Sequence, residues 1–351
     1  MAGHTSQPTS TGKKQYQSMI GRLNLDEGKI EWAPVLTGEK ILDANGKSLG
    51  NEDAGDVNSV LRKYDYYYVA TRKGIAVLNA KDEEDKLFTP ITDFVGSSTN
   101  PVENSIYFVK TPGSAKHLCH YYPSSGSGFS FLYLTQPFPS DYNGNTPLPA
   151  SLINFSMDQG SGTLCGMDSD KTGNGKSILN SKDFDITTWS PTVNQMKVSE
   201  MVYPIDGKNV LANLNGRLYA CLGKGGLYVR KNVTTMEGSS VVEDTIKFTD
   251  AKDGEGSRPV NGVFVEESEN FNDGFIYVAN GACLTILDRE TLEQVAEYSA
   301  YIPGKVEDAS ANYVHVVRTD TQTNGKCPDR LITVAYGQAG VKVFKFIPPT
   351  R

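Results

Sequence analysis

Four stretches of the chain share one pattern of apolar and polar positions. Each has a β-rich apolar run ending on alanine, a short turn that contains glycine, and a second apolar run. They read YYYVATRKGIAVLN from Tyr66, RLYACLGKGGLYV from Arg217, FIYVANGACLTILD from Phe275 and LITVAYGQAGVKVF from Leu331. The alanines that align are Ala70, Ala220, Ala279 and Ala335. Because the glycine lies between two strand-like runs rather than before a helix, the pattern predicts a β-hairpin and not a phosphate-binding loop.

The hairpins belong to a longer repeat. Two weaker units fit between Ala70 and Ala220, with second strands predicted at 117–122 and 163–167. A short β-rich run precedes each hairpin and another follows it, as in LEQVAEYS from Leu292. The unit is thus about four strands, recurring at intervals of roughly 45 to 60 residues, which is typical of a β-propeller. One such sheet cannot bury both faces alone, so the units must pack against one another.

The repeat predicts an all-β chain with six four-stranded blades. The last unit ends after its third strand, VKVFKF, and the missing strand is predicted from KIEWAPVL, beginning at Lys29, which would close the ring and remove a free edge. In the alternative, residues 16–36 form a hairpin of a seventh blade. We expect a disordered polar tail over residues 1–14 and a single propeller domain over 15–351.

The repeat resembles a known family. The segments YVANGACLTILD and TVAYGQAGVKVF are similar to the YVADGxxGLxIVD core of LVIVD-type propeller repeats. The resemblance implies a β-propeller with a binding role outside the cytoplasm, as in surface lipoproteins of Bacteroidetes, and it implies no catalytic residues. The chain departs from the family pattern at Thr71, Asn280 and Tyr336, where the family often has Asp.

Composition narrows the classes of partner. The net charge of −7 disfavours nucleic acid, which needs a basic surface. No apolar run approaches the roughly 20 residues of a membrane helix. The first residues lack the apolar region of a signal peptide. The resemblance implies a cell-envelope or surface protein, or a secreted one, so we expect that a signal or lipid anchor has been removed. The five cysteines contain no CxxC spacing and are interpreted as small buried residues.

The most informative candidate site residues open the predicted first strands. These polar residues are Asn58, Asn104, Ser151, Glu200, Asn261 and Asn312. In a propeller the first strands line the central channel, so a ring of amides near one mouth could bind a polar ligand. The alternative is that these side chains only satisfy backbone groups in the turns.

Two further segments offer weaker candidates. Phe138 and Tyr142 lie in a Pro- and Gly-rich stretch, where a loop would expose rigid aromatic rings to a sugar or a protein. Asp168, Asp170 and Thr172 have the spacing of the first half of a calcium loop, although Leu179 stands where the closing Glu would be. The sequence therefore predicts no cofactor, with calcium as the alternative.

Catalytic patterns are sparse. The four histidines are His4, His117, His120 and His315, and no nucleophile is spaced near them in a recognised motif. We therefore predict a non-catalytic cell-surface protein that binds a glycan, a small nutrient or cofactor, or a protein, acting in adhesion or in nutrient capture for an outer-membrane transporter. The alternative is a propeller hydrolase or lyase that uses carboxylates in the channel.

Overall fold

The structure is a computed structural model of the whole chain. The residues it describes are 2–8, 14–24, 26–42, 48–53, 57–63, 66–71, 74–80, 105–110, 116–122, 128–135, 138–147, 152–158, 163–169, 175–182, 192–197, 210–214, 217–231, 243–249, 258–266, 274–299, 310–325, 327–336 and 340–349. Side chains are described within parts of 19–80 and of 210–349. The chain divides into two units, Met1–Ala150 and Ser151–Arg351.

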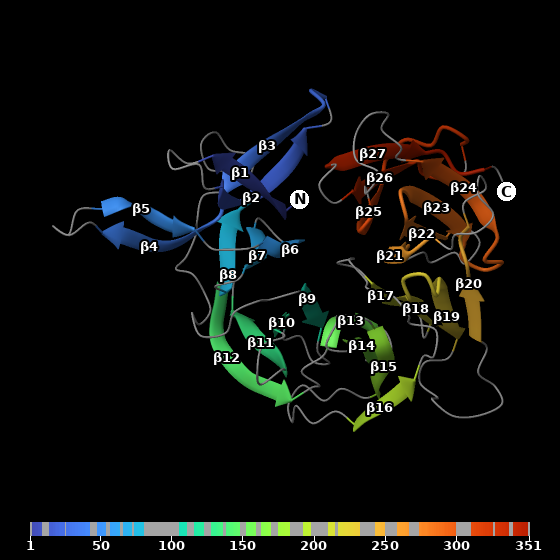
Figure 1. The fold of residues 1–351 in the computed structure, drawn as a ribbon, viewed down its shortest axis with the longest axis horizontal. Helices are drawn as coiled ribbons and strands as arrows, with labels where there is room; N and C mark the ends of the chain where they lie inside the picture. The colour runs from blue at the N-terminus through green and yellow to red at the C-terminus, as the bar shows by residue number, and fades with distance from the viewer. Residues whose placement is uncertain are drawn as a thin grey trace. The chain divides into compact units, whose positions relative to one another are not determined.

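The first unit consists of antiparallel sheets whose strands are paired in chain order (Figure 1). Its strands are β1 (Ala2–Pro8), β2 (Lys14–Asn24), β3 (Lys29–Pro34), β4 (Leu36–Leu42), β5 (Ser48–Asp53), β6 (Val57–Lys63), β7 (Tyr66–Thr71), β8 (Gly74–Asn79), β9 (Ser105–Lys110), β10 (Lys116–Tyr122), β11 (Gly128–Thr135) and β12 (Phe138–Pro147). The sheets are β1–β3, the hairpin β4–β5, β6–β8 and β9–β12. Strand β6 contacts both β1 and β9, so the first strands of three sheets are neighbours.

The second unit repeats this plan. Its strands are β13 (Leu152–Asp158), β14 (Thr163–Ser169), β15 (Gly175–Lys182), β16 (Thr192–Lys197), β17 (Leu211–Leu214), β18 (Arg217–Cys221), β19 (Leu227–Lys231), β20 (Glu243–Ile246), β21 (Val260–Val265), β22 (Phe275–Asn280), β23 (Cys283–Asp288), β24 (Gln294–Ser299), β25 (Tyr313–Arg318), β26 (Arg330–Ala335) and β27 (Val341–Phe346). They form the sheets β13–β16, β17–β20, β21–β24 and β25–β27. The first strands again lie in a row, because β17 contacts β13 and β21, and β21 contacts β25.

The structure confirms the predicted hairpins. The four matching stretches are β7–β8, β18–β19, β22–β23 and β26–β27, and the two weaker second strands fall within β10 and β14. Each aligned alanine lies in the second strand of its sheet. The described residues contain only strands, turns and irregular segments, and no helix among them has the length and hydropathy needed to span a membrane.

Backbone hydrogen bonds join two of the hairpin turns to the next sheet. The amide of Val260, the first residue of β21, donates to the carbonyl of Gly223 in the turn before β19, at 2.8 Å. One sheet later, the amide of Ala311 donates to the carbonyl of Gly281 at 2.6 Å. The turn that recurs in the sequence therefore also sets the spacing between neighbouring sheets.

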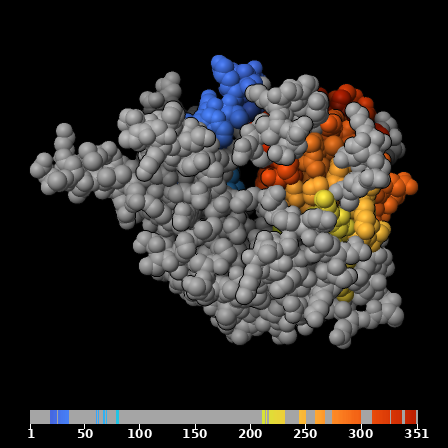
Figure 2. All heavy atoms as spheres, viewed as in Figure 1, coloured from blue at the N-terminus to red at the C-terminus, as the bar shows by residue number. Residues whose placement is uncertain are grey.

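Strands β22 and β23 of sheet β21–β24 are buried on both faces. Ile276, Val278 and Leu287 pack on the core of sheet β17–β20. The alternate residues, including Tyr277 and Ile286, pack on the core of sheet β25–β27. Figure 2 shows the described atoms of these sheets, coloured yellow to red, in close contact on one side of the view. Continuous apolar runs, rather than alternating ones, are the sequence signal of strands buried on both faces.

The N-terminal region differs from the prediction. The segment from Lys29 is β3, which pairs with β2, while β27 closes a three-stranded sheet. The side-chain oxygen of Asn24 accepts the amides of Asp26 and Glu27, so this turn closes a hairpin between strands adjacent in sequence. The alternative hairpin over 16–36 matches this pairing. Residues 2–8, expected in a disordered tail, form β1 along the edge of β2.

Two other predictions are corrected. The strand that pairs with β18 is β17, not the predicted first strand at Glu200, because the short connection at 215–216 favours a local hairpin. Phe138 and Tyr142 lie in β12 rather than in a loop, opposite Thr135 and Leu132. Proline is tolerated there because β12 is an edge strand, and two register shifts absorb the irregularity.

Gly226 provides a test of the contact between its turn and β20. Its φ is 101°, and a Cβ added there would lie 2.2 Å from the backbone oxygen of Ile246. We expect Gly226→Ala to lower the free energy of unfolding by about 2–4 kcal/mol, since backbone cannot move aside cheaply. Gly325→Ala is the matched control, because φ is 70° but no atom lies within 4 Å, and it should cost about 1 kcal/mol. Equal losses in urea unfolding would contradict the close approach.

Candidate functional site

Bulges at the start of the first strands single out the predicted amides. In β21 the register shifts between Val260 and Gly262, which leaves Asn261 as an extra residue. In β6 the same shift between Val57 and Ser59 leaves Asn58 as the extra residue. A β-bulge re-aims the side chain of the inserted residue and is common beside functional sites. The two residues thus occupy equivalent positions in their sheets.

Asn261 contacts the start of the next first strand. Its Nδ2 donates to Ser310 Oγ at 2.7 Å and to Asn312 Oδ1 at 3.4 Å. The backbone amide of Asn312 donates to Ala335 O at 2.9 Å, which fixes this residue against β26. We call Asn261, Ser310 and Asn312 the amide cluster. The structure therefore brings together two of the six residues predicted at the channel mouth.

The amide cluster is incompletely hydrogen-bonded. Asn261 is 1% exposed, yet its Oδ1 has no partner among the described residues. The Ser310 hydroxyl hydrogen and the side-chain amide hydrogens of Asn312 also have no acceptor there. An unpaired buried carbonyl costs about 1–3 kcal/mol, so a native structure keeps one only for a reason.

None of the other predicted mouth residues has a described side chain. Asn104, Ser151 and Glu200 lie outside the described residues. In β13 the register shift falls at Ile153 rather than at the expected polar residue. For Asn58, Phe138 and Tyr142 the backbone alone is described, so their binding roles remain predictions.

A second polar chain lies at the same edge of sheet β21–β24. Asn280 Nδ2 donates to Thr285 Oγ1 at 2.9 Å, and Thr285 Oγ1 donates to Glu297 Oε2 at 3.0 Å. Arg258 completes the chain with an ion pair to Glu297 at 2.7 Å. Sequence analysis missed this chain, although the register places Thr285 opposite Glu297.

Hydrogen bonds favour the charged forms of Arg258 and Glu297. Burial alone would raise the pKa of Glu297, but hydrogen bonds from Arg258 and Thr285 outweigh it and hold the pKa below its ordinary value of 4.5. Burial likewise opposes the charge on Arg258, yet its hydrogen bond to Glu297 leaves its pKa raised. Both groups stay ionised near neutral pH and neutralise each other.

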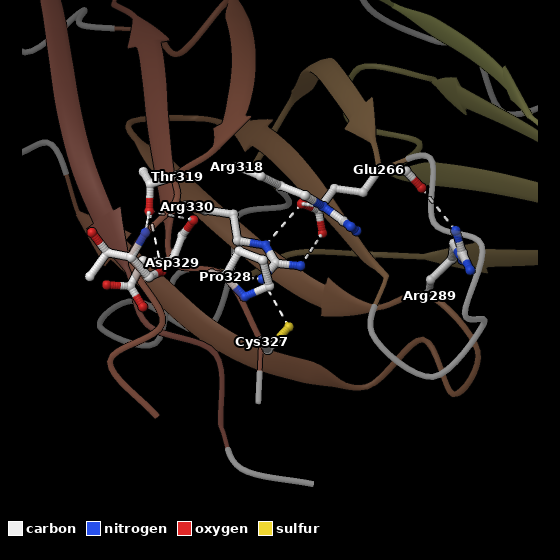
Figure 3. Close-up of polar contacts among 9 residues, drawn as sticks. Glu266, Arg289, Arg318, Thr319, Cys327, Pro328, Asp329 and Arg330 are labelled. Carbon is white, nitrogen blue, oxygen red and sulfur yellow. Dashed lines mark hydrogen bonds and ion pairs between the residues drawn. The ribbon is translucent and has the colours of Figure 1, made fainter. Parts of the chain in front are cut away.

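The opposite edge of the sheets holds an ion-pair cluster, which we define as Glu266, Arg318 and Arg330 (Figure 3). Arg330 Nε and NH2 donate to the two oxygens of Glu266 at 2.9 and 3.1 Å, and both side chains are almost fully buried. Arg318 adds a contact to Glu266 at 3.3 Å. Since Glu266 follows β21 and Arg330 begins β26, the pair ties two neighbouring sheets together.

Arg330 also makes hydrogen bonds and a cation–π contact outside the ion-pair cluster. Its NH1 donates to Cys327 Sγ at 3.0 Å and to the carbonyl of Pro328, and its guanidinium lies 5.4 Å from the ring centre of Phe275. Burial alone would lower the pKa of Arg330, but the hydrogen bonds to Glu266 raise it. Asp329 beside it is bound by Thr323 and Lys345, and the Thr323 hydroxyl lowers its pKa.

The predicted metal ligands and the cysteines can be located only in part. Within the described ranges, no three His, Cys, Asp or Glu side chains gather to hold a metal ion. Asp168 lies in β14 opposite Ser177, while Asp170 and Thr172 are outside the described residues, so the calcium loop stays a prediction. Cys221, Cys283 and Cys327 are buried and form no disulfide, as expected for packing residues.

The ion-pair cluster predicts a large difference between two carboxylate substitutions. Glu266→Gln leaves the buried Arg330 charge uncompensated and should lower the free energy of unfolding by about 3–5 kcal/mol. Glu290 also makes a bidentate pair, with Arg217 at 3.0 Å, but its side chain is 34% exposed. Glu290→Gln should therefore cost less than about 1 kcal/mol in the same urea titration. Similar losses for both variants would contradict the role assigned to Glu266.

The depressed pKa of Glu297 predicts a pH effect. The stability that its ionised form contributes is present above the ordinary value of 4.5 and is lost as the pH falls through the lower folded value. Between about pH 5 and pH 3, the wild type should therefore lose more stability than Glu297→Gln. Glu293→Gln, at an exposed carboxylate, is the control and should track the wild type. If the unfolding free energy fell equally with pH in the wild type and in Glu297→Gln, the lowered pKa of Glu297 would be contradicted.

Comparison with known proteins identifies the fold. No protein-family model matches the chain, and no curated protein matches it. The WD40 domain of Toxoplasma gondii coronin is similar over 99% of this chain and 80% of its own, with a TM-score of 0.56 and 12% identity. BBS1N, solved in complex with ARL6DN and soaked with lead, is similar over 95% of this chain and 89% of its own, with a TM-score of 0.52 and 11% identity. Together with the repeated antiparallel sheets, these likenesses show that the chain is a β-propeller.

Proposed function

We propose that this protein is a non-catalytic binding protein that engages its ligand at the amide cluster. The observation that carries the proposal is the buried, unpaired Oδ1 of Asn261, held between two neighbouring first strands. A group that costs stability and makes no structural contact is the kind of group that a ligand satisfies. The bulge that positions Asn261 supports the same function.

The ionised groups support binding over catalysis. Glu266, Glu290 and Glu297 each form an ion pair with an arginine, so their carboxylate oxygens already have partners. General acid–base chemistry needs a group that can exchange a proton near the working pH. Amide side chains do not exchange protons there, so the amide cluster is suited to recognition.

The class of partner follows from chemistry and from resemblance. A glycan, a small nutrient and a protein all carry neutral groups that can form hydrogen bonds with the unpaired groups of the amide cluster. The likeness to LVIVD-type repeats supports a place at the cell envelope or surface, as an adhesion protein or as an accessory to an outer-membrane transporter. BBS1N forms a complex with a protein, which is a fold-level precedent for a protein partner.

The number of sheets bears on how the ring is built. Seven sheets of three or four strands, with β4–β5 as a separate hairpin, support seven blades rather than six. The local β2–β3 hairpin supports the arrangement in which the N-terminal region supplies its own blade. Closure by an N-terminal strand added to β27 is correspondingly less favoured.

A thermal-shift screen tests the proposed function. A ligand present at 100 times its Kd adds about 2.7 kcal/mol to the unfolding free energy, which should raise Tm by a few degrees. The screen should include glycans, corrinoids, porphyrins, divalent cations and candidate proteins. We expect the shift to disappear in Asn312→Ala and to persist in Gln294→Ala, whose exposed amide lies at the opposite edge of β24.

The same experiment distinguishes a binder from an enzyme. Ligand recovered after incubation should be chemically unchanged by mass spectrometry. Conversion of the ligand, or a shift of equal size in Asn312→Ala, would refute the proposal.

A further inference from the structure

The amide cluster leaves three kinds of hydrogen-bonding group unused at one place. Asn261 Oδ1 is a free acceptor, and Ser310 Oγ and Asn312 Nδ2 carry free donor hydrogens. They lie close together because Asn261 Nδ2 contacts both partners, at 2.7 and 3.4 Å. A ligand group that meets Asn261 is therefore within reach of the other two side chains.

The cluster is electrically neutral, which excludes several ligand classes. Phosphate and carboxylate ligands are held by guanidinium or ammonium groups, and calcium by carboxylates. No charged side chain belongs to the cluster. Among the described residues at this edge, Arg258 and Glu297 neutralise each other at 2.7 Å, and Lys224 is exposed in the turn whose Gly223 bonds Val260. The matching ligand group is itself neutral.

The matching group also donates and accepts at nearly the same point. A hydroxyl does both through one oxygen, donating to Asn261 Oδ1 and accepting from Ser310 or Asn312. A peptide unit separates its donor and acceptor on two atoms that face opposite ways. On this ground we infer that the amide cluster, if the proposed binding function is correct, takes the hydroxyl groups of a neutral saccharide. The rigid sugar ring limits the entropy lost on binding.

Burial makes the site selective for that hydroxyl. Asn261 is 1% exposed, whereas Ser310 and Asn312 are half-buried and lie nearer to solvent. A ligand that contacts Ser310 and Asn312 reaches the Oδ1 of Asn261 only by displacing the atoms that cover it, because this oxygen is inaccessible to solvent. A site built around a buried acceptor rejects the analogue that leaves the acceptor unpaired. The deoxy sugar that lacks this one hydroxyl should accordingly bind at least tenfold more weakly.

Titration calorimetry on the full chain tests the inference. The probes are glucose, galactose, mannose, N-acetylglucosamine and their short oligosaccharides, followed by deoxy analogues of whichever binds. We expect Asn261→Leu and Ser310→Ala each to weaken binding at least tenfold, because each removes a group that the hydroxyl contacts. Gln294→Ala, the exposed-amide control, should leave Kd unchanged within about twofold. Ser310→Ala keeps the test valid if Asn261→Leu folds poorly.

Each outcome has one meaning. Saccharide binding that is lost in both variants and kept in the control supports the inference. Saccharide binding unaffected by either variant overturns the assignment to the amide cluster. Binding of a peptide, corrinoid or other class through Asn261 and Ser310 overturns the saccharide but leaves the proposed function standing. No binding by any class overturns both.

Discussion

An apolar sheet can hide its two faces only against other sheets, and the architecture of this protein follows from that constraint. Sheet β21–β24 shows it most clearly, since residues such as Ile276 and Tyr277 alternate between the cores on its two sides. The same constraint requires neighbouring sheets to keep a fixed spacing. Backbone bonds from Val260 to Gly223 and from Ala311 to Gly281 provide it in two successive steps. Each sheet is thus located by its neighbours rather than by its own hydrogen bonds.

Most of the packed interior is apolar, and the polar groups at the two edges of the sheets differ in what they do. At one edge the buried carboxylate of Glu266 is matched by Arg330, and the bidentate geometry compensates for the loss of water. At the other edge the amide cluster leaves the Oδ1 of Asn261 unmatched. The Oδ1 of Asn261 is one of several buried polar atoms without a partner among the described residues, and Tyr277 Oη near the ion-pair cluster and Asn280 Oδ1 are others. What distinguishes Asn261 is its place between two first strands, beside the half-buried side chains of Ser310 and Asn312, and this is the physical reason to look for a ligand at the amide cluster.

The fold could be predicted from sequence because its signal is local and repeated. The hairpins around Ala70, Ala220, Ala279 and Ala335 depend on residues a few positions apart, and all four are present. The predicted pairing was wrong where a strand had more than one possible partner strand. The segment KIEWAPVL alone does not indicate that β3 pairs with β2. The contact that favours this pairing is the hydrogen bond that the side-chain oxygen of Asn24 accepts from the amide of Asp26 in the adjacent turn. Likewise, a short loop made β17 the partner of β18.

The candidate site was predictable only in part. Asn261 and Asn312 could be found because they hold equivalent places in two repeats, and the structure joins them by a side-chain hydrogen bond. Ser310 and the pairing of Glu266 with Arg330, 64 residues apart, could not be predicted, because such contacts depend on how neighbouring sheets are aligned.

Whether Asn261 is kept for binding rather than for stability can be measured directly, as the unfolding free energy of Asn261→Leu in urea without ligand. If it is kept for binding, this variant should be as stable as the wild type within about 0.5 kcal/mol, or more stable, because removing an unpaired buried carbonyl offsets the loss of the hydrogen bond from Nδ2 to Ser310. A loss of more than about 2 kcal/mol would show that Asn261 is a structural residue and would contradict the binding role.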